Sequence, residues 1–283
     1  MGRTIALYSD SGGGKTTQIG EYAKFIFKSS GRRTILNAAD LGGFSALNPL
    51  IKKGIILVNK YDPSVNDPWV WINQAVEAAA SKEIGLHAFD SGTSMCEALL
   101  SSCAKLSAAG QDIGGRPAPK FVINKGSKDA IKIGSNVDSH YMTVQGFIKD
   151  AINRSTWIDT EAIPSDILWT FGLYRGESQT DQAIYGPQLA GKALTPLMPK
   201  WFLYTFPLVV DVTAGQSPKH RLLLQQQPDS MGMATYYANS RYPMGGTTPC
   251  PLAIEPASLP EAITCIENAA KEAEDNLDAE LGL

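Results

Sequence analysis

Short apolar segments alternate with segments of helical periodicity along the first half of the chain. Apolar runs that end in polar or glycine residues predict buried strands, and apolar positions three and four residues apart predict amphipathic helices. The predicted strands are residues 4–8, 34–38, 54–59 and 86–90, and the predicted helices run from a glycine-rich loop to about residue 30, over 70–81 and over 95–109. This alternation indicates βαβ units, and therefore a mostly parallel twisted sheet with helices on both faces.

The second half of the chain breaks this rhythm. Residues 110–139 are rich in Gly, Pro and Lys and predict an extended loop, with a hairpin as an alternative. The later predicted elements are a helix over 141–154, strands over 167–173 and 201–211, antiparallel strands near 221–225 and 235–237, and an acidic amphipathic helix from residue 258 onward. We therefore expect an α/β domain over 1–255 with antiparallel strands added at the C-terminal edge of its sheet, followed by a C-terminal helix over 256–283.

Composition narrows the class of protein without identifying it. The 283 residues carry a net charge of −3 and are 43% hydrophobic, which is typical of a globular protein. A membrane span of about 18 apolar residues and a secretory signal are both missing from the pattern, so we expect a cytoplasmic protein. The four cysteines form no C-x-x-C pair and lie far from the three histidines, which favours reduced thiols over a zinc site.

The strongest chemical signal is the segment S-D-S-G-G-G-K-T-T at residues 9–17. It follows a predicted strand, opens a predicted helix, and nearly matches the phosphate-binding pattern G-x-x-x-x-G-K-[ST], with Ser9 in place of the first glycine. In such a loop the backbone N–H groups point at a phosphate, the lysine reaches its oxygens, and the hydroxyl ligates Mg²⁺. The predicted nucleotide-binding residues are Ser11, Gly12, Gly13, Gly14, Lys15, Thr16 and Thr17.

Two aspartates at predicted strand ends complete this site. Asp90 ends the strand over 86–90, where a carboxylate holds Mg²⁺ together with the Thr16 hydroxyl. Asp40 follows the strand over 34–38, where a carboxylate can polarise an attacking water; the start of a D-L-G-G turn is an equal alternative. The predicted catalytic residues are Lys15, Asp40 and Asp90, and the predicted metal ligands are Thr16 and Asp90.

A possible guanine-recognition motif argues for a different nucleotide. Residues 59–62, N-K-Y-D, match the N-K-x-D motif of GTPases, and residues 40–43, D-L-G-G, match their D-x-x-G motif. The spacings are wrong, because too few residues separate Lys15 from Asp40 for a switch segment and its strand, and N-K-Y-D precedes the strand that ends at Asp90. We therefore interpret residues 59–62 as the exit of a strand and predict ATP rather than GTP.

Together these motifs resemble the RecA-like P-loop ATPases of phages, including the Sak-type single-strand-annealing ATPases. The resemblance covers about residues 3–245 and rests on the phosphate loop, on F-D-S at 89–91 and on three later segments. These segments are H-Y-M-T-V-Q-G-F-I-K-D-A-I from residue 140, Y-G-P-Q-L-A-G-K-A from 185 with P-K-W-F after it, and R-L-L-L-Q-Q-Q-P-D from 221 with Arg241 after it. The resemblance implies a RecA-like fold, ATP and Mg²⁺ as cofactors, homo-oligomers that form rings or filaments, and single-stranded DNA as a partner.

The resemblance also implies roles for single residues. Asp40 takes the position of the acid that activates water, a polar sensor falls near Thr170, and Arg175 and Arg241 are candidates for a phosphate contact, with a surface salt bridge as the alternative. The basic loop over 116–132 is predicted to face single-stranded DNA, with a solvated loop as an equal alternative. Its lysines are Lys120, Lys125, Lys128 and Lys132.

Two other functions stay open at this point. A nucleotide-binding virion, assembly or DNA-packaging protein with weak hydrolysis is favoured by Ser9 and by Asp40, which is shorter than the glutamate more common in the family. Its location would be the virion rather than the host cytoplasm. A small-molecule kinase would need an arginine-rich lid, which the sequence does not show.

Overall fold

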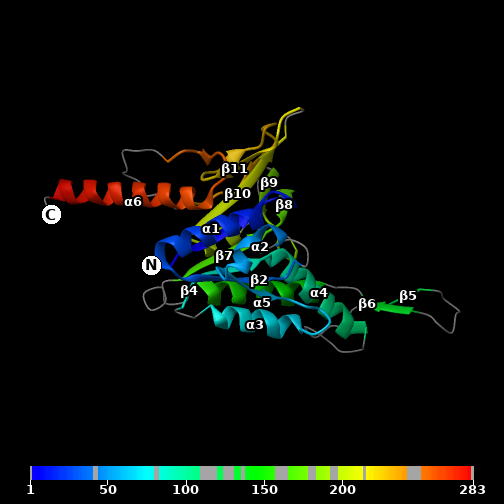
Figure 1. The fold of residues 1–283 in the computed structure, drawn as a ribbon. Helices are drawn as coiled ribbons and strands as arrows, with labels where there is room; N and C mark the ends of the chain where they lie inside the picture. The colour runs from blue at the N-terminus through cyan, green and yellow to red at the C-terminus, as the bar shows by residue number, and fades with distance from the viewer. Residues whose placement is uncertain are drawn as a thin grey trace.

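A mostly parallel sheet forms the centre of the molecule (Figure 1). The computed structural model describes residues 2–40, 44–79, 83–108, 120–123, 131–134, 138–156, 165–177, 183–191, 197–212, 215–240 and 250–281. Within these residues eight strands pair in the order β14-β11-β10-β1-β7-β4-β2-β3. In that order the strands are Ala253–Ile254, Lys219–Leu223, Tyr204–Asp211, Thr4–Tyr8, Asp166–Phe171, Ile84–Asp90, Arg33–Ala38 and Ile56–Lys60.

The pairing confirms the fold class expected from the sequence. The six strands from β10 to β3 run parallel to their neighbours, whereas β11 and β14 add antiparallel strands at one edge. The strand β7 lies between β1, which leads into the phosphate loop, and β4, which ends at Asp90. The chain thus has a RecA-like α/β architecture, and the carboxyl ends of β1, β7, β4 and β2 meet at one edge of the sheet.

Helices cover both faces of this sheet (Figure 1). One face is covered by α1 (Lys15–Ser30), α2 (Asn48–Lys52), the short η1 (Ser45–Leu47) and α6 (Leu259–Leu281). The other face is covered by α3 (Pro68–Ala78), α4 (Gly92–Ala108) and α5 (Asp138–Thr156). Within the described residues no helix is apolar over a stretch long enough to cross a bilayer.

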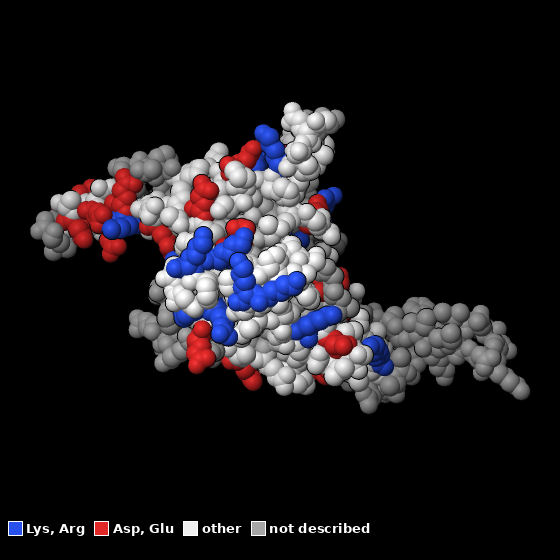
Figure 2. Space-filling model, viewed as in Figure 1, with Lys and Arg blue, Asp and Glu red and all other residues white. Residues whose placement is uncertain are grey.

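The two halves of α6 differ in their surroundings. Its first half contributes buried side chains to the core, from Leu259 to Ala269. Its second half extends beyond the body of the molecule (Figure 1) and carries most of the acidic side chains seen on that side (Figure 2).

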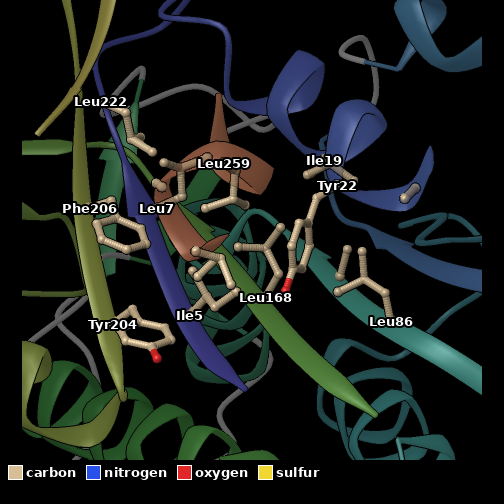
Figure 3. Packing of buried hydrophobic residues seen from close by; sticks show 14 of the residues in the cluster. Ile5, Leu7, Ile19, Tyr22, Leu86, Leu168, Tyr204, Phe206, Leu222 and Leu259 are labelled. Atoms are coloured by element: carbon tan, nitrogen blue, oxygen red, sulfur yellow. The ribbon is translucent and has the colours of Figure 1, made fainter. Parts of the chain in front are cut away.

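The core follows from the alternation of side chains along the strands. Ile5 and Leu7 of β1 pack with Ile19 and Tyr22 of α1 and with Leu259 of α6 (Figure 3). The alternate residues of β1, Ala6 and Tyr8, face the second cluster with α3, α4 and α5. The central strands β1, β7 and β4 are therefore buried on both faces, which explains why their sequences are apolar runs rather than alternations.

A second, four-stranded sheet is a difference from the sequence prediction. It pairs β12-β13-β9-β8, which are Gln227–Pro228, Ala234–Tyr236, Ala183–Pro187 and Leu173–Glu177. The predicted strand over 167–173 is confirmed up to Phe171, but its end is wrong, because the chain leaves the central sheet at Gly172. The Gly172 N–H donates to Thr93 Oγ1 and its carbonyl accepts from the Gln188 N–H, both at positions outside the central sheet. The prediction that 235–237 closes the edge of the central sheet is wrong too, because β13 lies in this second sheet, where it pairs antiparallel with β12 and parallel with β9.

A short hairpin lies inside the predicted basic loop. Strands β5 (Lys120–Ile123) and β6 (Ile131–Gly134) pair antiparallel, which confirms the hairpin alternative for 110–139. Lys125 and Lys128 lie outside the described residues, as does Arg241.

A network of ion pairs and hydrogen bonds lies at the amino end of the central strands. The Asp166 carboxylate accepts hydrogen bonds from the Arg3 backbone N–H at 2.8 Å, from Arg3 Nη1 at 2.9 Å and from the Tyr22 hydroxyl at 2.6 Å. Arg3 also forms an ion pair with Glu267 of α6, with Nε and Oε1 2.6 Å apart. This network ties β1, β7, α1 and α6 together at the end of the sheet opposite the phosphate loop.

Candidate functional site

The connection between β1 and α1 forms a tight loop at the carboxyl end of the strands. Gly12 and Gly14 have φ angles of 75° and 98°, a left-handed conformation that favours glycine. Gly13 is required for a different reason, because a Cβ at this position would lie 2.4 Å from Ser9 Oγ. The loop therefore depends on all three glycines.

Ser9, which replaces the first glycine of the motif, takes part in the loop. It is buried, and its carbonyl and hydroxyl accept hydrogen bonds from Lys15 Nζ at 3.0 and 3.1 Å. The Asp10 carbonyl accepts a third bond from the same nitrogen at 3.0 Å. Burial lowers the pKa of Lys15, while the nearby carboxylates of Asp90, Asp10 and Asp40 oppose that shift. The serine thus supplies an acceptor for the lysine, and the departure from the motif is compatible with its geometry.

The first turn of α1 offers donors suited to a phosphate. An α-helix leaves its first N–H groups without an acceptor inside the helix, and its dipole is positive at that end. Here those donors belong to Lys15, Thr16 and Thr17. Together with residues 10–14 they line a cleft of about 670 Å³, within the usual range of small-molecule sites of about 300–1,000 Å³. The loop glycines, the free N–H groups and the size of the cleft fit a nucleoside triphosphate.

Asp90 lies at the base of this cleft, between two threonines. Its carboxylate accepts hydrogen bonds from Thr16 Oγ1 at 3.1 Å and from Thr170 Oγ1 at 2.5 Å. Burial raises the pKa of Asp90, and the two threonine hydrogen bonds and Lys15 act in the opposite direction. A carboxylate and a hydroxyl are the oxygen ligands that Mg²⁺ takes, so the structure brings the predicted metal ligands Thr16 and Asp90 into contact. Thr170, expected to be a sensor, reaches the same carboxylate because β7 adjoins β4.

Asp40 lies on the same cleft, after the end of β2. Its backbone N–H donates to the Asp90 carbonyl at 3.3 Å, and its side chain is exposed. Glu97 of α4 is a second exposed carboxylate on the cleft. The sequence pattern did not identify Glu97, because nothing in the sequence of a helix shows which of its exposed acidic residues faces a cleft.

Arg175 of β8 lies at the rim of the cleft. Its Nη2 forms an ion pair with Asp10 Oδ2 at 2.7 Å, and both side chains are largely exposed. Within this chain Arg175 therefore has the surface salt bridge that was the alternative to a phosphate contact.

Two further residues at the site had no role assigned to them from the sequence. His220 of β11 holds its Nδ1 3.1 Å from the Gly13 carbonyl oxygen. Gln188 lines the cleft, and its carbonyl accepts from Thr93 Oγ1 at 2.7 Å. Gln188 belongs to the G-P-Q-L-A-G-K segment, so a signal for it was present. His220 depends on the pairing of β11 with β10, which the local sequence does not specify.

The N-K-Y-D segment does not line the cleft. It belongs to β3 and its exit, at the outer edge of the sheet, separated from β1 by β7, β4 and β2. Asn59 is engaged in structural hydrogen bonds, donating to Asn37 Oδ1 at 2.9 Å and accepting from Trp71 Nε1 at 3.2 Å. The structure therefore agrees with the interpretation of residues 59–62 as a strand exit.

Comparisons with known proteins give no family for the chain. No family model and no curated protein matches it. Among solved structures it is similar to the flagellar accessory protein FlaH from Methanocaldococcus jannaschii, with 11% identity, 83% of this chain and 82% of that chain covered, and a TM-score of 0.40. It is also similar to a KaiC-like protein from Pyrococcus horikoshii OT3, with 12% identity, coverage of 78% and 77%, and a TM-score of 0.38. At these TM-scores the likeness is partial, and the fold is assigned from the topology of the sheet.

Proposed function

We propose that this chain is a Mg²⁺-dependent ATPase whose nucleotide binds in the cleft above residues 9–17. The observation that carries the proposal is the 3.1 Å contact between Thr16 Oγ1 and Asp90 Oδ2 at the base of a cleft that also holds Lys15. That contact joins the two oxygen ligands of a magnesium site to the lysine and N–H groups of a phosphate site. Bound Mg²⁺–ATP supplies an electrophilic phosphoryl group to such a site.

Each residue of the site has a separate role in the proposed reaction. Lys15 exchanges its acceptors on Ser9 and Asp10 for phosphate oxygens, and the N–H groups of the first turn of α1 donate to the same phosphates. Thr16 and Asp90 would hold the metal, and Thr170 keeps the Asp90 carboxylate in place. Asp40 orients the attacking water and accepts its proton.

We further propose that hydrolysis serves the recombination or annealing of single-stranded DNA, as the resemblance to phage RecA-like ATPases implies. Support comes from the G-P-Q-L-A-G-K segment, one of the most diagnostic of that resemblance, which contributes Gln188 to the cleft. The alternative is a nucleotide-binding virion, assembly or packaging protein with weak hydrolysis. It is favoured by the short, exposed Asp40 side chain at the position where the family more often has glutamate.

Replacing Lys15 by alanine tests nucleotide binding. The change removes a charge-assisted contact of the kind that contributes about 1.5–3 kcal/mol each, so we expect ATP affinity to fall by at least about 100-fold. Titration of a fluorescent ATP analogue with Mg²⁺ measures it. Lys24→Ala, on an exposed face of the same helix, is the matched control and should bind as the parent chain does. Unchanged affinity in Lys15→Ala would refute the site.

Replacing Asp40 by asparagine tests hydrolysis separately from binding. We expect ATP turnover to fall by about 100-fold or more, within the usual effect of a general base of about 10²–10⁴, with nucleotide affinity retained. Glu97→Gln, at another exposed carboxylate that lines the cleft, is the control, and its loss of turnover instead would assign the role to Glu97. Measuring ATP turnover with and without a single-stranded oligonucleotide separates the two proposed functions. Hydrolysis that DNA stimulates supports a role in recombination or annealing. ATP binding without turnover supports the virion, assembly or packaging protein.

A further inference from the structure

The apolar stripe of α6 continues beyond the part of the helix that the body covers. Its first half buries Leu259, Ile263 and Ile266 against the central sheet and α1. The same helical spacing places Leu277 and Leu281 on the second half, where their side chains are 53% and 63% exposed. We use the name arm for residues 271–281, which span about 16 Å at 1.5 Å per residue. An apolar stripe that is buried in its first half and bare in its second half indicates a missing partner surface.

The arm is strongly acidic. It contains one lysine and five acidic residues, and Figure 2 shows these acids gathered at the end of the molecule that the arm forms. Two arms side by side would repel each other at neutral pH, because like charges on facing helices are destabilising. The partner surface is therefore expected to be basic, with apolar side chains among its charges.

A surface of this kind exists on the chain itself. Lysine and arginine side chains gather over α1 and α2 in Figure 2. We use the name basic corner for Lys28, Arg33, Lys52 and Lys53, all exposed. The Thr34 N–H bonds the Ile55 carbonyl at 2.9 Å, so the start of β2 and the residues after α2 meet there. One partly exposed apolar side chain lies next to Lys28 on α1, Phe27 at 37%.

The arm and the basic corner lie at the same end of the sheet. The Leu259 N–H, at the start of α6, bonds Gln18 Oε1 in the first turns of α1, near the phosphate loop. Eight residues further on, Glu267 pairs with Arg3 at the amino end of β1. The helix thus runs toward the amino ends of the strands, where β2 begins beside the end of α1. Two copies facing each other at this end can exchange arms by a twofold axis, which is the commonest symmetry of soluble homo-oligomers.

We propose that the chain forms a twofold dimer in which the arm of each copy docks on the basic corner of the other. Leu277 and Leu281 cover Phe27 of the second copy, and the acids that flank them face Lys28, Arg33, Lys52 and Lys53. This surface does not involve the phosphate loop, so the dimer does not depend on the proposed ATPase activity. It gives a defined interface to the self-association that the resemblance implies.

Charge reversal with rescue by mixing tests this interface in the full-length chain. The first variant combines Glu274→Lys, Asp275→Lys and Asp278→Lys in the arm, and the second combines Lys28→Glu, Lys52→Glu and Lys53→Glu in the basic corner. Sedimentation velocity at low salt should show a dimer for the parent chain and a dimer dissociation constant at least about tenfold higher for each variant alone. The equimolar mixture of the two variants should restore the dimer, because each reversed arm then meets a reversed corner. High salt should weaken the parent dimer.

A control variant with Glu77→Lys and Asp150→Lys reverses exposed charges on α3 and α5, over the other face of the sheet, and should leave the dimer unchanged. Circular dichroism of each variant shows whether it is folded. A parent chain that stays monomeric at all concentrations overturns the proposal, as does a dimer that both reversals leave intact. Loss of nucleic-acid binding by the corner variant with an unchanged dimer also overturns it, since the basic corner would then serve a polyanion.

Discussion

Two aspartates on adjacent strands are almost equally buried, but only one of them has a positively charged hydrogen-bonding partner. Asp166 begins β7 and is 3% exposed, whereas Asp90 ends β4 and is 6% exposed. Asp166 accepts three hydrogen bonds, two of them from Arg3, and forms an ion pair with the Arg3 guanidinium. Asp90 accepts from two neutral hydroxyls, and no ion pair to it is present among the described residues.

This difference indicates that the charge of Asp166 has a structural role, whereas the charge of Asp90 is available to a ligand. A buried carboxylate with a paired guanidinium is compensated, and removing it leaves the partner charge unpaired. The raised pKa of Asp90 shows that burial disfavours its charged form, so Asp90 lowers the stability of the nucleotide-free chain at neutral pH. Such an uncompensated charge in a cleft is typical of functional sites. The same substitution at the two positions should therefore have opposite effects on stability.

The largest effect is expected at Asp166. In Asp166→Asn an amide N–H₂ group faces donors that need an acceptor, and the Arg3 charge keeps only its ion pair with Glu267. We expect the free energy of unfolding to fall by about 3 kcal/mol, at the lower end of the range for a broken buried pair because Arg3 is partly exposed. Urea denaturation measures the change. ATP affinity should stay as in the parent chain, and a loss of affinity without a loss of stability would contradict the structural role of this end of the sheet.

An effect of intermediate size is expected for His87, in the middle of β4. Neither of its ring nitrogens has a hydrogen-bonding partner among the described residues. Burial lowers the pKa of His87 to about 4, below the value of about 6.5 in an unfolded chain. The unfolded state then binds the proton first as the pH falls, so stability is lost on going from pH 7 toward 4. Between pH 7 and 5 we expect His87 to account for a loss of about 2 kcal/mol.

His87→Leu removes this titration while keeping an apolar side chain of similar size. The expected result is a flatter dependence of unfolding free energy on pH below 6.5, with the difference between variant and parent largest near pH 4–5. Urea denaturation at several pH values measures it. Parallel pH profiles for the two chains would show that His87 has a partner when folded.

These contrasts show which parts of the molecule the sequence could predict. The loop at residues 9–17 depends on local backbone geometry, and its contact with Asp90 follows from two parallel strands ending at the same edge. Thr170 was expected at the site from a family resemblance, yet its bond to the Asp90 carboxylate requires β7 to lie between β1 and β4, which only the tertiary structure decides. Nothing near Asp166 in the sequence points to Arg3, more than 160 residues away.

The hydrophobic pattern gave a wrong strand end where one apolar run continues from the central sheet into the second sheet. Residues 167–173 are apolar enough for one strand, but Gly172 lets the backbone leave the central sheet and start β8 in the second sheet. The packing of Gly172 against Gln188 then brings the G-P-Q-L-A-G-K segment to the cleft. A strand predicted by hydrophobicity alone cannot show this division, because Phe171 before Gly172 and Leu173 after it pack against the same apolar cluster.

The smallest change in stability is expected for Asp90→Asn, which also tests the contrast between Asp90 and Asp166 most directly. The substitution removes a buried charge while leaving an amide that can still bond Thr16 and Thr170, so we expect the nucleotide-free chain to gain about 1 kcal/mol of stability at pH 7. The folded-state pKa of Asp90 is raised, so the parent chain recovers stability as the pH falls through that value, and the advantage of the variant should shrink in acid. Mg²⁺ should no longer increase ATP affinity in the variant, because the metal loses its carboxylate ligand. Urea denaturation with and without Mg²⁺–ATP measures both effects, and a variant that is destabilised by as much as Asp166→Asn would show that the two ends of the sheet do not differ in the proposed way.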